Sequence, residues 1–196
     1  MALGYIAAFS ETMAKAVVDA KGISPLIEAL KPGNEDHVRY ASAWTLGQIG
    51  RHSPEHAKAV AEANGLTHLV EAYSSNQSSE DLKLKAKRAL KGIIEKCTTM
   101  PALEALIDAP PKIQQYIVHQ FAKILPNDVK ARKDFVTNGS LQKIQLIQAQ
   151  PGTKLKDSIL TINNCYPEEI VQYYSPGFSK SLLAKIDDGS ANPQQQ

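Results

Sequence analysis

The sequence has little of several features that mark special classes of protein. It contains only two cysteines, Cys97 and Cys165, among 196 residues. Two cysteines so far apart favour reduced thiols in an intracellular protein over a disulfide framework. No apolar run approaches the roughly 20 residues of a membrane-spanning helix, and the first residues lack the basic and apolar regions of a secretory signal. The sequence therefore predicts a protein without a membrane segment.

An excess of charge of either sign is also missing. Lys and Arg number 22 and Asp and Glu number 20, which gives a net charge of +2. Such a balance gives no reason to expect binding to nucleic acid or to a membrane surface. The chain is 43% hydrophobic and 21% charged, as is usual for a folded protein. Its length permits one domain, or one elongated array, with a buried core.

Motifs of catalysis and of metal binding are lacking as well. His52 and His56 are four residues apart, but Ser53-Pro54 starts a helix between them and no third ligand stands out. The segment "PGTK" at 151–154 lacks the glycine spacing and the preceding strand of a phosphate loop. No nucleophile motif is present. We therefore expect no catalysis, no metal and no cofactor, with the two histidines at a solvated corner between helices.

What the sequence does contain is an internal repeat. Residues 1–30 align with residues 44–73, so that the segment "AKAV" recurs at 14–17 and 57–60. Self-similarity at a fixed period of about 40 residues is typical of a helical solenoid. The other identical positions are Leu3 and Leu46, Gly4 and Gly47, Ile6 and Ile49, Ser10 and Ser53, and Gly22 and Gly65.

Each repeat has the pattern of one long helix and two shorter ones. Asn34 is placed to cap a long helix, and Ser53 is an N-cap with Pro54 at the first helical position. Asn64-Gly65 supplies a residue that tolerates a positive φ, so the chain is expected to turn there. Residues 66–73 then form the third helix. A unit of this size has too small a core to fold alone, and neighbouring units must stack.

The pattern continues less regularly towards the C-terminus. Matching isoleucines stand at Ile6, Ile49, Ile93, Ile124 and Ile162, with spacings of 43, 44, 31 and 38 residues. No strand pattern occurs. We expect an all-α array of about four repeats over residues 1–186 and a disordered tail over residues 187–196. Because residue 1 falls inside a long helix, the array is expected to be the C-terminal part of a longer one. Its N-terminal end should then expose apolar surface and support self-association.

Several segments resemble known families. "SAWTLGQIG", "SPEHAKAVAEANGL" and "HLVEAY" resemble the armadillo repeat, whose units form a right-handed superhelical solenoid. "LGQIGRHSPEHAKAVA", "SSEDLKLKAKRALKGIIEKC", "KARKDFVTNGSLQKIQ" and "CYPEEIVQYYSPGFSKSLL" are similar to one armadillo family in particular. This is the axonemal central-pair family, called sperm-associated antigens in animals. The similarity covers residues 2–186.

That resemblance implies a structural scaffold without enzymatic activity. Members of the family support the central microtubule pair of motile cilia and flagella. The resemblance implies a cytoskeletal location in the axoneme, partners among other central-apparatus proteins, and a role in motility through protein binding. The alternative is an armadillo-type adaptor in the cytoplasm that carries cargo or signals.

The groove of armadillo proteins is the first candidate binding site. In those that carry nuclear-import cargo, a Trp and an Asn four residues later line the groove and clamp a basic peptide. Here Gln48 follows Trp44 in place of Asn. The matching positions hold Met1 and Tyr5, Arg88 and Gly92, and His119 and Lys123. The regular series of Trp and Asn pairs is therefore absent from this chain, and cations in the groove would repel a basic cargo peptide.

Residues 83–96, "KLKAKRALKGIIEK", suggest what replaces that ladder. Lys87, Arg88 and Lys91 cluster at helical spacing, and Glu95 is the only acidic residue in the stretch. They are either a solvated face or a basic strip for an acidic partner such as a tubulin tail. RNA binding is less favoured, because exposed aromatics are not interleaved with the charges. The groove candidates are Tyr5, Trp44, Gln48, Lys87, Arg88, Lys91, His119 and Lys123.

The segment "IVQYYSPGF" is the second candidate site. Tyr173, Tyr174 and Phe178 either seal the core of the last repeat or, if exposed, form an aromatic anchor for a partner. Both interpretations remain open from the sequence.

Overall fold

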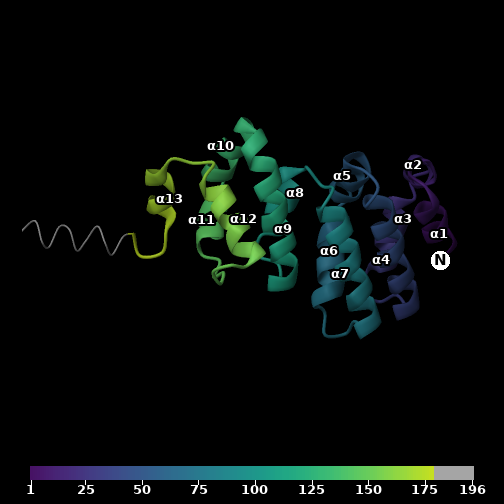
Figure 1. The fold of residues 1–196 in the computed structure, drawn as a ribbon. Coiled ribbons are helices and arrows are strands. Elements are labelled where there is room, and N and C mark those ends of the chain that lie inside the picture. The colour runs from purple at the N-terminus through teal and green to yellow at the C-terminus, as the bar shows by residue number, and fades with distance from the viewer. Residues whose placement is uncertain (179–196) are drawn as a thin grey trace, which may run out of the picture. The chain divides into compact units, whose positions relative to one another are not determined.

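The fold is all-helical. The structure is a computed structural model that describes residues 1–178, so the expected tail at 187–196 and the end of the expected array lie outside the described residues. Figure 1 shows helices and no strands in the described part. The helices are α1 (Ala2–Phe9), α2 (Glu11–Asp19), α3 (Ile23–Leu30), α4 (Asp36–Gly50), α5 (Pro54–Glu62), α6 (Gly65–Ser74), α7 (Glu80–Ile94), α8 (Met100–Glu104), α9 (Pro111–Ile124), the 3-10 helix η1 (Leu125–Asn127), α10 (Val129–Thr137), α11 (Ser140–Gln145), α12 (Lys154–Asn163) and α13 (Glu168–Tyr174).

The described part of the chain divides after Gln120 into two compact units, residues 1–120 and residues 121–178. In the first unit two triads, α2–α3–α4 and α5–α6–α7, each have two short helices followed by a long one. The long helix α4 packs against α1 on one side and α7 on the other, so the third helices of successive triads are neighbours. This is the stacking that the sequence repeat predicts, because each triad buries its apolar face against the next.

The core of the first unit comes from the residues that recur in the repeat. Leu46 and Ile49 of α4 and Ile93 of α7 are fully buried. Burial of such side chains contributes about 1.5–3 kcal/mol each, as an upper estimate. Gly47 lets α4 and α7 approach closely, because a Cβ placed there would lie 2.8 Å from the Cα and the Cβ of Ala89.

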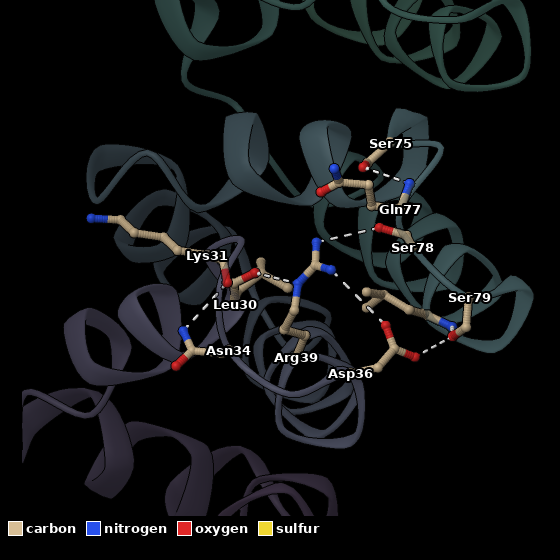
Figure 2. A network of polar contacts seen from close by, with 10 residues as sticks. Leu30, Lys31, Asn34, Asp36, Arg39, Ser75, Gln77, Ser78 and Ser79 are labelled. Atoms are coloured by element: carbon tan, nitrogen blue, oxygen red, sulfur yellow. Dashed lines mark hydrogen bonds and ion pairs between the residues drawn. The ribbon is translucent and has the colours of Figure 1, made fainter.

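A buried arginine joins three segments of the first unit. Arg39 of α4 is only 6% exposed. Its Nε donates to the carbonyl oxygen of Leu30 at the end of α3, and one terminal nitrogen donates to Ser78 Oγ in the loop before α7. The other terminal nitrogen lies 3.9 Å from Asp36 Oδ1, and Asp36 in turn accepts a hydrogen bond from Ser79 (Figure 2). The guanidinium therefore supplies hydrogen bonds to a free carbonyl oxygen at the end of α3 and to a hydroxyl in the loop before α7.

The second unit contains a further triad of shorter helices, α10–α11–α12, followed by α13. Its core includes Phe121 and Phe135, which are both fully buried with ring centroids 4.8 Å apart in an edge-to-face arrangement. Such a pair adds about 0.5–1.5 kcal/mol to the area burial. Tyr166 ties the end of α12 to α10 by donating from its hydroxyl to the carbonyl oxygen of Arg132.

The helix starts show which local signals hold. Ser79 accepts a hydrogen bond from the backbone N–H of Leu82 and Asp128 from that of Ala131, so both residues cap their helices. Ser53 occupies the N-cap position before Pro54. The turn at 64–65 is made by Asn64 itself, with φ of 62°, whereas the turn at 138–139 is made by Gly139, with φ of 80°.

The expected cap at Asn34 is wrong. The helix α4 begins at Asp36 with Glu35 in the N-cap position. The side-chain amide of Asn34 instead donates to the carbonyl oxygens of Glu28 and Lys31. Because these carbonyls lie at the end of α3, where the helix leaves its last acceptors unpaired, Asn34 completes the preceding helix.

Candidate protein-binding site

A pocket of about 250 Å³ lies between α4 and α7. From α4 and its C-terminal end come Trp44, Gln48 and Arg51, and from α7 come Lys85 and Arg88. The floor consists of small residues, Gly47, Ala89 and Gly92. We name it the α4/α7 pocket. It forms because glycine and alanine at the helix contact leave room beside the larger side chains.

The charge of the α4/α7 pocket is entirely positive. Arg51, Lys85 and Arg88 line it and no carboxylate does. None of the three forms an ion pair with another described residue. Lys85 lies over the ring of Tyr40, with Nζ 5.1 Å from the ring centroid, an attraction that fixes its position without neutralising it. The pocket therefore presents three uncompensated cations to whatever enters it.

The other groove candidates on α7 lie elsewhere on that helix. Lys85, Arg88 and Gly92 follow one another at three and four residues and share a face. Lys87 and Lys91 share a different face and do not line the pocket. Lys91 is exposed and lies 3.9 Å from Glu95, while Lys87 is half-buried. The sequence does not identify Arg51 or Lys85 as a site residue; each lies three residues from one that it does identify, Gln48 or Arg88, but this spacing alone does not show which helix faces meet.

The aromatic candidates at the first repeat lie together. Tyr5 of α1 meets Trp44 edge to face, with ring centroids 4.9 Å apart. Tyr5 is largely exposed, while Trp44 and Gln48 are half-buried. Trp44 thus contacts a second aromatic ring on one side and the cationic pocket on the other. His119, half-buried, and Lys123, exposed, lie on α9.

The C-terminal aromatic residues do not belong to the core of the second unit. Tyr173 is 62% exposed, and Tyr174 and Phe178 are half-buried. Tyr173 meets both of the other rings edge to face, at centroid distances of 5.0 Å and 5.6 Å. No residue of α13 is buried, which favours the interpretation as an exposed anchor over sealing of the core. The cluster is a surface feature.

The two histidines that could suggest a metal site have other roles. His52 Nε2 lies 2.7 Å from the carbonyl oxygen of Ala7, and His56 Nδ1 lies 2.8 Å from Ser53 Oγ. His56 is only 5% exposed, so the expected solvated corner is wrong for this residue. Among residues 1–178, no three His, Cys, Asp or Glu side chains are grouped to hold a metal ion.

Apolar side chains gather at the first two helices. Met1, Leu3, Tyr5, Ile6, Phe9 and Met13 are all exposed. Their counterparts in the next repeat include Leu46 and Ile49, which are fully buried because a preceding helix, α1, packs beside α4. The same positions in α1 and α2 therefore form an apolar surface of the type that stacks against another repeat. No helix within the described residues is both long enough and apolar enough to cross a membrane.

Solved structures similar to this chain share its fold. A computationally designed armadillo repeat protein for modular peptide recognition covers 88% of this chain with a TM-score of 0.59 and 17% identity, over 77% of its own length. A designed armadillo repeat protein in complex with the peptide (KR)4 covers 85%, with a TM-score of 0.56 and 18% identity, over 73% of its own length. At these identities the likeness shows an all-α armadillo fold.

Sequence comparison gives a more specific relation. No protein-family model matches the chain. Sperm-associated antigen 6 of mouse is 56% identical over 154 residues, which are 78% of this chain. The human protein of the same name is 55% identical over 154 residues. The chain spans about 30% of the length of these relatives. On this identity, together with the fold, the chain belongs to the sperm-associated antigen 6 family of armadillo-repeat proteins.

Proposed function

We propose that this chain is a non-enzymatic scaffold of the axonemal central apparatus and that its α4/α7 pocket binds acidic segments of protein partners. Its family and its armadillo fold support a protein-binding role. The observation that carries the choice of partner is the set of three unpaired cations, Arg51, Lys85 and Arg88, around Trp44. A pocket of one sign of charge attracts and orients a segment of the opposite sign.

The acidic C-terminal tails of tubulin are the segments that fit this role in an axoneme. They are flexible and strongly negative, so a short stretch of one tail can place carboxylates against Arg51 and Arg88. Arginine suits such contacts, because its planar guanidinium can bond a carboxylate with two parallel hydrogen bonds. Trp44 and Gln48 supply an apolar wall and an amide beside these charges. Other acidic central-apparatus proteins would enter by the same contacts.

The alternative function, an adaptor that carries basic cargo peptides, has less support. Two of the residue pairs that match those of import receptors, Trp44 with Gln48 and Arg88 with Gly92, line the α4/α7 pocket together with Arg51 and Lys85. A lysine-rich cargo peptide would meet like charges there, and juxtaposed like charges in an interface disfavour binding. The charge of the pocket therefore selects against the cargo class that import receptors carry.

The site is tested by direct binding of an acidic probe. The chain should bind a fluorescent octaglutamate peptide with an affinity that falls as salt increases. Arg51→Glu with Arg88→Glu reverses two pocket charges and should abolish the binding. Lys58→Glu with Lys112→Glu makes the same change in net charge at exposed positions outside the pocket, and should retain most of it. Equal loss in both double variants would show that only net charge matters and would refute the site.

The axonemal assignment needs a test of its own. The full-length protein, tagged and expressed in a cell with motile flagella, should be found along the central pair by immuno-electron microscopy. Label confined to the outer doublets or to the cell body would contradict the assignment. That result would leave the chemistry of the α4/α7 pocket, measured with octaglutamate, as a separate finding.

A further inference from the structure

A groove of about 450 Å³ lies in the second unit, between α10 and α13. Its walls are largely apolar, with Val129 and Val136 from α10 and Ile170 from α13. Val129 is 59% exposed, and Val136 and Ile170 are half-buried, so their side chains leave apolar surface uncovered. We name it the α10/α13 groove. Its volume lies within the range of about 300–1,000 Å³ that is usual for ligand pockets.

Two cations line the α10/α13 groove, and no carboxylate does. They are Arg132 and Lys133 of α10. Neither forms an ion pair with a described residue. The carboxylates at the start of α13, on Glu168 and Glu169, are exposed but do not line the groove. The charge of the groove is therefore positive, and a group that enters it should be negative.

The side chain of Arg132 is already fixed in the chain alone. Its Nη1 donates to the carbonyl oxygens of Leu125 and Pro126, at 3.0 Å and 2.9 Å, which leaves Nε and Nη2 for a carboxylate. Tyr166, from the other wall, donates from its hydroxyl to the carbonyl oxygen of Arg132. Because these bonds order the arginine beforehand, binding of a carboxylate loses less side-chain entropy.

The armadillo fold does not require cations at this place. Helix α10 begins a triad and α13 follows that triad, as α2 and α5 do in the first unit. The pocket between α2 and α5 has a mainly acidic charged lining, with Glu11, Asp19 and Glu55 against Lys15. Equivalent places in the two units thus differ in the sign of their charge. The cations of the α10/α13 groove are therefore free to serve recognition.

We propose that the α10/α13 groove binds a short acidic segment of a protein partner, which inserts leucine or another large apolar side chain. That side chain would pack against Val136 and Ile170, and flanking carboxylates would bond Arg132 and Lys133. Burial of the apolar side chain supplies affinity, while the cations fix the direction of the segment and disfavour basic ones. A fatty acid combines the same groups, but the exposure of Val129 would leave much of its long hydrocarbon chain in water.

The α10/α13 groove differs from the α4/α7 pocket in what it needs from a ligand. The pocket has small residues on its floor and takes carboxylates, whereas the groove needs an apolar side chain as well. The inference does not depend on the axonemal assignment. Either site can fail its test alone, because octaglutamate has no apolar side chain to place in the groove.

The probe is a fluorescent peptide made of two copies of Glu-Leu-Leu-Glu. It is titrated into the full chain carrying Arg51→Glu with Arg88→Glu, which removes the α4/α7 pocket as a second site for carboxylates. Fluorescence anisotropy should show saturable binding that weakens as salt increases. Because Cys165 lines the groove, the bound peptide should also slow its alkylation by iodoacetamide. Octaglutamate should leave that rate unchanged.

The variant that tests the groove is Val129→Glu with Lys133→Glu. It should weaken peptide binding by about tenfold or more, since it removes an apolar contact and turns an attraction into a repulsion. Both positions are exposed, and residue 129 lies in the first turn of α10, where negative charge is favourable, so folding should persist. Leu146→Glu with Lys154→Glu makes the same changes at exposed positions outside the groove and should bind normally.

Several outcomes would overturn the proposal. No saturable binding at millimolar peptide, equal weakening in the matched control, or an unchanged rate at Cys165 while the peptide binds would each refute the site. Protection of Cys165 by oleate and not by the peptide would assign a lipid instead. A lower average mass of the groove variant in light scattering would assign a second copy of the chain. Faster alkylation without peptide in Leu182→Lys with Leu183→Lys would assign the chain's own C-terminal residues.

Discussion

Gly47 of α4 faces Ala89 of α7 so closely that a Cβ on the glycine would lie 2.8 Å from the Cα of the alanine. The neighbour at that point is backbone, which cannot rotate away. Gly47→Ala should therefore separate the two helices and lower the free energy of unfolding by about 1–3 kcal/mol, the range for overpacked cores. Urea denaturation of the variant and of the unaltered chain measures this difference in the free energy of unfolding.

The matched control is Gly92→Ala. A Cβ there would lie 3.3 Å from the Cβ of Arg51, which is the C-cap residue of α4, where the end of the helix can shift by a few tenths of an ångström. Alanine also gains about 1 kcal/mol of helix propensity over glycine. Gly92→Ala should thus be neutral or stabilising. Equal stability of the two variants would show that the contact of α4 with α7 tolerates a side chain at Gly47.

Arg39 is expected to stabilise the first unit through the hydrogen bonds that its guanidinium group donates. Arg39→Ala leaves the carbonyl oxygen of Leu30 and the hydroxyl of Ser78 without their partner and should cost about 1–3 kcal/mol. Arg39→Lys keeps the attraction to Asp36 but cannot reach both oxygens at once, so its loss should be intermediate. Thermal unfolding would contradict this account if the alanine and lysine variants were both as stable as the unaltered chain.

The two thiols should react at different rates. Burial raises the pKa of Cys97, and no part of that residue is exposed. Burial also raises the pKa of Cys165, but Arg132 opposes the shift and the residue is only half-buried. Since the thiolate is the reactive form, iodoacetamide near neutral pH should modify Cys165 slowly and Cys97 hardly at all, as mass spectrometry would show. Both should react equally in urea, and fast labelling of Cys97 in the folded chain would contradict its burial.

The apolar surface of α1 and α2 should drive self-association of this chain. Phe9 is 83% exposed and Met13 lies on the next helix. Phe9→Lys with Met13→Lys should lower the average mass measured by light scattering at high concentration. Leu84→Lys with Val129→Lys changes exposed apolar residues elsewhere and should leave the mass unchanged. An unaltered chain that stays monomeric throughout the concentration series would refute this prediction.

Local signals in the sequence predict much of the fold, and they fail where a side chain bonds a different helix from the one that follows it. Ser53 stands at the N-cap of α5 as expected, and Ser79 and Asp128 each cap a helix by accepting a hydrogen bond from a backbone N–H three residues later. Asn34 has the right residue type for a cap, yet its amide bonds the carbonyl oxygen of Glu28, six residues earlier. That choice depends on how the chain leaves α3, which composition does not encode.

The residues of the candidate site likewise include some that local spacing predicts and others that depend on how helices pack. Trp44, Gln48 and Arg88 were found because the repeat places them at matching positions, and all three line one pocket. Arg51 and Lys85 were missed, since the pocket depends on which faces of α4 and α7 meet. The neighbours of His56 in the sequence predict a solvated corner for this residue. Its burial arises from the packing of α2 against α5, a contact between two repeats.

Co-sedimentation of the chain with microtubules, at low and at about 0.15 M salt, tests the central claim most directly. The tubulin tails should be either intact or removed by proteolysis, and Arg51→Glu with Arg88→Glu should be run beside the unaltered chain. The account predicts pelleting that needs the tails, weakens with salt and is lost in the double variant. Pelleting that persists without the tails, or no pelleting of the unaltered chain with intact tails at low salt, would contradict it.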